Sequence, residues 1–174
     1  MHYQKYQKKS AFSLIELMVA IGVIAVLTAI ATPIYVNYTI KANVSSALPI
    51  LEGLKTQISE YYTANGSFPT SFCTTSVTTG CINSSSYSDG KFIGGSSLST
   101  SCPALTGVTG TVLGCAQVTF NNPNQSNYPL NGTVLSFIAI DGGSAIQWIC
   151  SGGSGANSVP TIYLPKSCQN PTPP

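Results

Sequence analysis

The chain has 174 residues, and its seven lysines and five acidic side chains leave only 7% of it charged, against roughly 25% in a typical soluble domain. Apolar residues make up 43%, which excludes a charge-driven disordered segment. A net charge of +2 without any arginine excludes a nucleic-acid binder that works through a large basic field. A chain of this length supports about one domain.

The charges are distributed unevenly along the chain. Lys5, Lys8 and Lys9 lie at the start, residues 17–40 carry no charge, and residues 66–174 carry only four charged side chains in all. The sequence therefore divides into a basic tip, an apolar rod and a neutral polar body.

Residues 12–36 form the apolar run FSLIELMVAIGVIAVLTAIATPIYV. A helix needs roughly 20 residues to span the hydrocarbon core of a membrane, so this run is long enough. The lysines in front of it predict that the N-terminus stays in the cytoplasm and that the body is translocated.

The run allows two interpretations. As a secretory signal it would be cleaved at the small residues Ala29 and Ala31, and a soluble domain would begin at Thr32. As a retained anchor it would stay attached to the body. Glu16 favours retention, because an ionisable residue in an apolar span is costly and rarely lacks a role. The helical pattern also continues beyond the run.

That continuation is an apolar helical stripe with alternating spacings of three and four residues: Val44, Ala47, Leu51, Leu54, Ile58 and Tyr61. Asn65-Gly66 supplies a stop signal. We therefore expect one long helix, from Ser13 to about Ala64. Pro33 and Pro49 should kink or loosen it, because each lacks a backbone donor. Residues 42–64 should cover a sheet.

Six cysteines all lie in the body: Cys73, Cys81, Cys102, Cys115, Cys150 and Cys168. An even number in a Ser/Thr-rich body predicts disulfides and an oxidising compartment. A metal site is disfavoured, since no C-x-x-C pair occurs and the only histidine is His2. Fifteen pairings are possible. We favour the neighbouring pairs, which close the shortest loops: Cys73–Cys81, Cys102–Cys115 and Cys150–Cys168.

The rest of the body predicts an antiparallel sheet. Residues 66–110 are rich in Ser, Thr and Gly and predict a long loop held by disulfides. Residues 111–120, 133–140 and 145–150 are apolar and β-branched, and Asp141-Gly142 between the last two is a strong hairpin signal. A shorter strand is expected near residues 161–164. The predicted fold class is α+β, an antiparallel sheet packed on the amphipathic half of the helix.

The segment Lys8-Lys9-Ser10-Ala11-Phe12-Ser13-Leu14-Ile15-Glu16-Leu17-Met18 resembles the processing site of type IV prepilins. The resemblance continues through Pro33 and Tyr35-x-x-Tyr38. Near the C-terminus, Gln147-Trp148-Ile149-Cys150 and residues 163–168 resemble the last strand and closing disulfide loop of type IVa pilins. Residues 67–130 match no motif.

The resemblance implies a pilin roll and five segments: the leader 1–11, the transmembrane helix half 12–40, the amphipathic half 41–65, the stapled loop region 66–110 and the sheet 111–174. It implies cleavage between Ala11 and Phe12 and methylation of the new amino terminus on Phe12. Ala11 stands where the family almost always has glycine, and the added Cβ predicts slower cleavage.

The resemblance also implies roles for Glu16 and Pro33 in filament assembly, with Glu16 of one subunit pairing with the Phe12 amine of a neighbour. The implied partners are further copies of the chain, a prepilin peptidase and methylase, and an assembly platform with its ATPase. The expected route runs from the bacterial inner membrane to an extracellular pilus, serving adhesion, motility or DNA uptake. We expect no cofactor, no metal and no enzymatic activity, because the sequence contains no nucleotide motif and no histidine in the body.

Three alternatives remain open on the sequence. A minor pilin or type II secretion pseudopilin shares the N-terminal design, although the body has too few carboxylates for the calcium site that pseudopilins often carry. A DNA-binding pilin is disfavoured, because residues 12–174 contain four lysines and five acidic residues. The third alternative is the secreted soluble domain with a cleaved signal.

Overall fold

The computed structural model describes residues 12–83, 88, 91–103, 110–143, 145–153 and 157–169. The chain divides into two compact units, Met1–Tyr38 and Thr39–Pro174.

The predicted long helix is present and has one interruption. Helix α1 covers Leu14–Ser46 and helix α2 covers Leu48–Asn65, with Ala47 as a turn residue between them. Pro33 lies inside α1 and does not end it. Pro49 lies in the first turn of α2. A backbone N–H at this position has no acceptor within the helix, so a proline, which has no N–H, is tolerated there. Gly66 ends α2 with a φ of 68°, and its N–H donates to the Tyr62 carbonyl.

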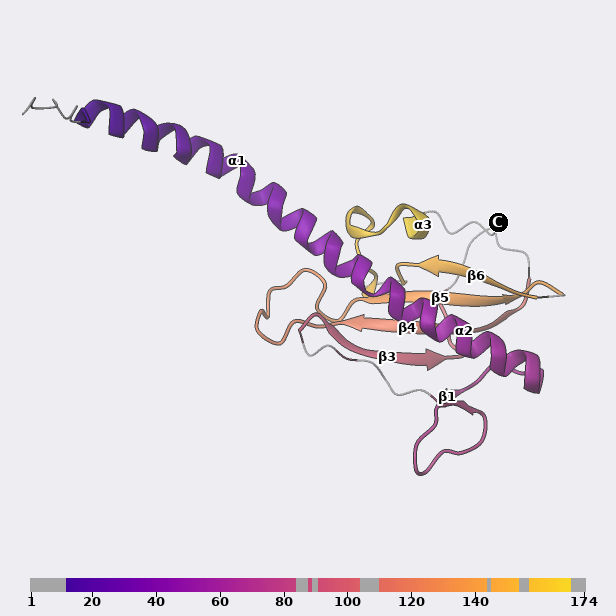
Figure 1. Cartoon of the computed structure of the whole chain (residues 1–174). Coiled ribbons are helices and arrows are strands. Elements are labelled where there is room, and N and C mark those ends of the chain that lie inside the picture. The colour runs from indigo at the N-terminus through magenta and orange to yellow at the C-terminus, as the bar shows by residue number, and fades with distance from the viewer. Residues whose placement is uncertain are drawn as a thin grey trace, which may run out of the picture. The chain divides into compact units, whose positions relative to one another are not determined.

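The second unit contains a four-stranded antiparallel sheet in the order β3-β4-β5-β6. Its strands are β3 (Ile93–Ser99), β4 (Val112–Phe120), β5 (Val134–Asp141) and β6 (Ile146–Ser151). Two short strands, β1 (Ser71–Phe72) and β2 (Cys81–Ile82), pair in parallel. Helix α2 lies across one face of the four-stranded sheet (Figure 1).

The predicted apolar stripe forms the helical side of the core. Val44, Ala47, Leu51, Leu54 and Ile58 are all buried, and Tyr61 is half-buried against them. The sheet contributes inward-facing side chains from β4 and β5: Ala116, Val118, Phe120, Leu135 and Phe137. The opposite face of the sheet holds a smaller cluster, made of Cys115, Ile138, Ile140 and Ile149. The α+β architecture is therefore confirmed.

The predicted Asp-Gly hairpin joins β5 to β6, with Asp141 opposite Ile146. The Gly143 N–H donates to Asp141 Oδ1 at 2.8 Å, and the Gly142 N–H donates to the Ala145 carbonyl at 3.1 Å. Gly143 has a φ of 81°, a conformation that glycine adopts without steric cost. The turn sequence therefore sets the register of this edge of the sheet.

Two expectations about the body differ from the structure. The region 66–110 was expected to be a loop, yet it contributes the edge strand β3 as well as β1 and β2. β3 reads IGGSSLS, which has weak strand propensity. It is held by pairing with β4 and by burial of Ile93 and Ser96, an effect of context that outweighs propensity.

The short strand expected at residues 161–164 is wrong. Thr161–Tyr163 is a 3₁₀ helix that follows Pro160, and α3 (Lys166–Gln169) comes next. The Tyr163 N–H donates to the Pro160 carbonyl, and the Leu164 N–H donates to the Thr161 carbonyl. An apolar run of this length fits a single helical turn as well as a strand.

Candidate functional site

The first unit presents an almost wholly apolar helical surface. From Phe12 to Tyr38 the large hydrophobic side chains are between 48% and 78% exposed. Burying one such side chain fully is favourable by about 1.5–3 kcal/mol. The helix is long and apolar enough to cross a membrane, and the apolar stretch that qualifies it is not buried in the molecule. This surface therefore requires lipid or other protein around it.

Glu16 is the one charged residue of this surface. It lies in the first turn of α1, where a carboxylate interacts favourably with the unpaired N–H groups of the helix start. Its side chain is exposed, and it forms no salt bridge within the described residues. Phe12 lies just before the helix and is 78% exposed. The carboxylate and the Phe12 region are both open to contacts from another molecule.

Hydroxyl groups in the middle of α1 are satisfied inside the helix. Thr28 Oγ1 donates to the Ile24 carbonyl and Thr32 Oγ1 to the Thr28 carbonyl, both at 2.8 Å. Internal bonds of this kind lower the cost of placing hydroxyls in lipid. Pro33 follows directly inside α1. Ala11 lies outside the described residues, and so does the bond between Ala11 and Phe12.

Three disulfides join the described cysteines: Cys73–Cys81, Cys102–Cys115 and Cys150–Cys168. Their Cα atoms are 5.0, 5.7 and 4.7 Å apart respectively, within the usual range for a disulfide. Cys115 lies in β4 and links it to the segment after β3. The Cys150–Cys168 bond links β6 to α3, and Cys168 is buried against the main core.

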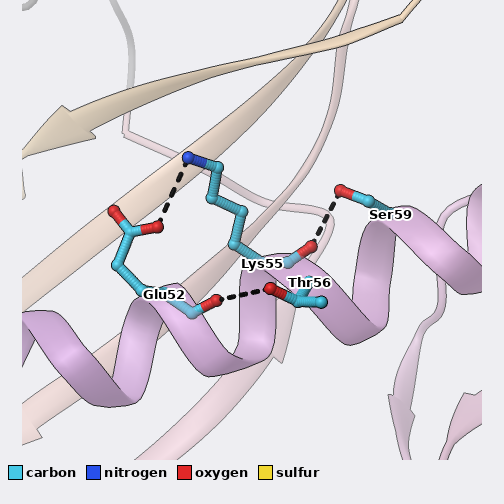
Figure 2. Close-up of polar contacts among 4 residues, drawn as sticks. All are labelled: Glu52, Lys55, Thr56 and Ser59. Atoms are coloured by element: carbon cyan, nitrogen blue, oxygen red, sulfur yellow. Dashed lines mark hydrogen bonds and ion pairs between the residues drawn. The ribbon is translucent and has the colours of Figure 1, made fainter.

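The exposed side of α2 has a short polar network (Figure 2). Lys55 Nζ lies 3.4 Å from Glu52 Oε2. Thr56 Oγ1 donates to the Glu52 carbonyl and Ser59 Oγ donates to the Lys55 carbonyl. An exposed pair at this spacing contributes only about 0.3–0.5 kcal/mol, so the network neutralises charge more than it stabilises the fold.

One long-range polar contact of the body has no signal in the sequence. Asn43 Nδ2 donates to the Tyr128 hydroxyl at 2.8 Å, which ties the loop after β4 to the last turns of α1. Burial raises the pKa of Tyr128, while the bond from Asn43 acts in the opposite direction. The two residues are 85 positions apart, and no local pattern in the sequence connects them.

Comparison with known proteins finds a matching family model for each of the two parts of the chain. Residues 40–169 match the family Pilin (bacterial filament), and residues 6–32 match the prokaryotic N-terminal methylation motif. The second match covers residues 6–11 of the basic leader together with Glu16 and most of the apolar run. That is the arrangement of a retained helix, not of a cleaved secretory signal.

Individual relatives agree with these matches. A fimbrial protein of Neisseria meningitidis serogroup B is 27% identical over 93% of this chain and 95% of its own length. A fimbrial protein of Neisseria meningitidis serogroup A is 30% identical over 82% of this chain and 72% of its own length. The type IV major pilin protein PilE1 of Neisseria gonorrhoeae is 26% identical, covering 93% and 88% respectively.

The matches fit the geometry described above. The methylation motif extends into the exposed apolar helix α1. The body that follows packs a helical stripe on an antiparallel sheet and has three disulfides. Proteins of this kind are structural subunits and not enzymes; they are made as membrane precursors and polymerise into a pilus. The chain belongs to the type IV pilin family.

Proposed function

We propose that a prepilin peptidase cleaves the precursor between Ala11 and Phe12, that Phe12 is then N-methylated, and that an assembly platform with its own ATPase polymerises the subunit. The observation that carries this proposal is the exposed apolar surface from Phe12 to Tyr38, with Glu16 as its single charge. Such a surface can be covered first by lipid and later by the same helices of neighbouring subunits.

Apolar burial alone cannot direct this polymerisation. Lipid tails are as apolar as the side chains of a neighbouring helix, so transfer from membrane to filament gains little from the hydrophobic effect. Close packing and polar contacts must therefore define how the helices align. We assign the ATPase of the assembly platform to a separate protein, because the sequence has no nucleotide-binding motif.

We assign the polar contact to Glu16 and the amino group of Phe12 from a neighbouring subunit. Cleavage creates a positive charge on Phe12 and removes the leader lysines. In the apolar centre of a filament, a subunit out of register would leave both charges without partners. Leaving one member of a buried ion pair unmatched costs about 3–5 kcal/mol. The pair would therefore select one axial register.

The test replaces Glu16 with Gln in the full-length chain, in a cell that assembles this pilus. A loss of about 3 kcal/mol per subunit predicts a drop in sheared filaments of at least roughly 100-fold. The amount of membrane precursor and its cleavage should stay as in the wild type, because Glu16 makes no described contact within the subunit.

Glu52→Gln is the matched control, because it removes an exposed carboxylate from the body. It should leave the filament yield unchanged. Normal filaments from Glu16→Gln would contradict the assignment of Glu16 to the subunit register.

A further inference from the structure

The described charges of the second unit are separated by sign along its length. Thr39–Pro174 contains eight charged residues: Lys41, Glu52, Lys55, Glu60, Asp89, Lys91, Asp141 and Lys166. Asp89 lies outside the described residues. Glu52 and Lys55 neutralise each other in the middle of α2. The remaining charges gather at two opposite ends of the unit, according to their sign.

Lys41, Lys91 and Lys166 mark what we call the proximal end. Lys41 lies two residues from Asn43, which donates to Tyr128. Tyr128 in turn lies 5.9 Å from the Phe92 ring, next to Lys91. Lys166 begins α3, whose Ser167 lines a cavity of about 220 Å³ together with Leu48, Glu52 and Lys55 of the first turns of α2, on the Lys41 side of Glu60.

Glu60 and Asp141 mark the distal end. Asp141 lines a cavity of about 420 Å³ with Ser59 and Thr63, which flank Glu60 on the last turns of α2. Figure 1 shows the end of α2 beside the turn between β5 and β6, and α3 toward the opposite end of β6. The helical rise of 1.5 Å per residue places Glu60 about 28 Å from Lys41 along the helix direction.

These four side chains are available for contact. Lys41, Glu60, Asp141 and Lys166 are all exposed, and none of them forms a salt bridge within the described residues. Among the described residues of this unit, the other charges between the two ends are those of the paired Glu52 and Lys55. An open polymer needs two different, complementary surfaces on each subunit, because its contacts are heterologous. Opposite charge at the two ends of one unit meets that requirement.

We infer that the proximal lysines of one subunit dock against the distal carboxylates of a second copy of this chain in the filament. The contact pairs Lys41 and Lys166 with Glu60 and Asp141 and acts together with the register set by Glu16. This inference rests on the polymerisation proposed above and adds a specific interface to it. An anionic membrane surface would also attract the proximal lysines, but it would leave the distal carboxylates without a role.

The test is a charge-reversal cycle in the full-length chain, scored by sheared filament yield. Lys41→Glu with Lys166→Glu makes both ends negative and should lower the yield about 10-fold, because several exposed pairs turn from attraction to repulsion. Adding Glu60→Lys and Asp141→Asn makes the distal end positive and should bring the yield back to within about 3-fold of wild type. Asn at position 141 keeps the oxygen that accepts the Gly143 N–H.

The exchange Glu52→Lys with Lys55→Glu is the matched control, because it moves two charges in the middle of α2 without changing either end. It should leave the yield unchanged. Precursor abundance and disulfide-dependent gel mobility verify that each variant folds.

Yields that stay normal in every variant would overturn the inference. A loss that the distal changes fail to rescue would also overturn it, and would assign the lysines to another partner such as anionic lipid. Both results can be distinguished from failure of the proposed function, because that function is tested separately by the filament yields of the wild type and of Glu16→Gln.

Discussion

At the scale of single residues, Tyr128 shows how one polar group depends on the packing around it. The residue is mostly buried, and its hydroxyl accepts a hydrogen bond from Asn43. Burial raises the pKa of the phenol above 10.0, and this effect is larger than the opposing effect of Asn43. The folded body therefore favours the neutral phenol. The resulting stability is present below pH 10 and is lost as pH rises through the raised pKa.

Tyr128→Phe tests this dependence. At pH 7 the variant should be about 1 kcal/mol less stable, because Asn43 loses its acceptor. As pH rises from about 9 to above 10, the stability of the wild type should fall more steeply than that of the variant. Urea unfolding of the detergent-solubilised chain, followed by the fluorescence of Trp148, measures both effects. Parallel pH profiles would show that ionisation of Tyr128 is not linked to folding.

Residues that interrupt a local pattern could be identified from the sequence, whereas residues defined by a long-range contact could not. Glu16 stands out because it interrupts a continuous apolar run, and the cysteines stand out by number and compartment. Asn43 and Tyr128 are ordinary residues in their local context. Their contact depends on how the loop after β4 packs on α1. The proximity of Asp141 to the end of α2 likewise becomes visible only in the folded unit, where Asp141, Ser59 and Thr63 line one cavity.

At the scale of elements, the Cys150–Cys168 disulfide holds the last part of the chain to the sheet. It closes a separation of 18 residues, whereas Cys73–Cys81 closes only 8. Loop-closure entropy predicts a loss of about 3 kcal/mol when the longer loop is opened, and somewhat less for the shorter one. Cys168 is also buried in the main core, which adds to the cost of releasing α3.

Cys150→Ser with Cys168→Ser should therefore lower the free energy of unfolding more than Cys73→Ser with Cys81→Ser. Urea midpoints of the two double variants, each compared with wild type under the same conditions, give the ranking. The reverse ranking would show that the terminal segment is held mainly by other contacts.

Elements with a strong period were predictable, and elements held by their neighbours were not. The stripe on α2 and strands β4, β5 and β6 follow from spacing and from the Asp-Gly turn. β3 carries two glycines and three serines, and it is a strand because β4 offers it a partner. Pro33 and Pro49 look alike in sequence. Only Pro49 coincides with a break, because the helix restarts there with proline in its first turn.

At the scale of the whole molecule, the low charge content has two separate explanations. The helix of the first unit lacks charge because its surface needs an apolar environment, and Glu16 is the exception. The body is held by an apolar core and three disulfides, and it contains only eight charged residues. The nominal net charge of +2 includes the leader, whose removal would make the subunit slightly acidic.

The most direct test of the account is mass spectrometry of intact subunits from sheared surface filaments. We predict that the subunit begins at Phe12, carries one methyl group on its amino terminus and contains three intact disulfides. A filament subunit that retained residues 1–11, or secreted material beginning at Thr32, would contradict processing at Ala11 and the role of the N-terminal helix in assembly.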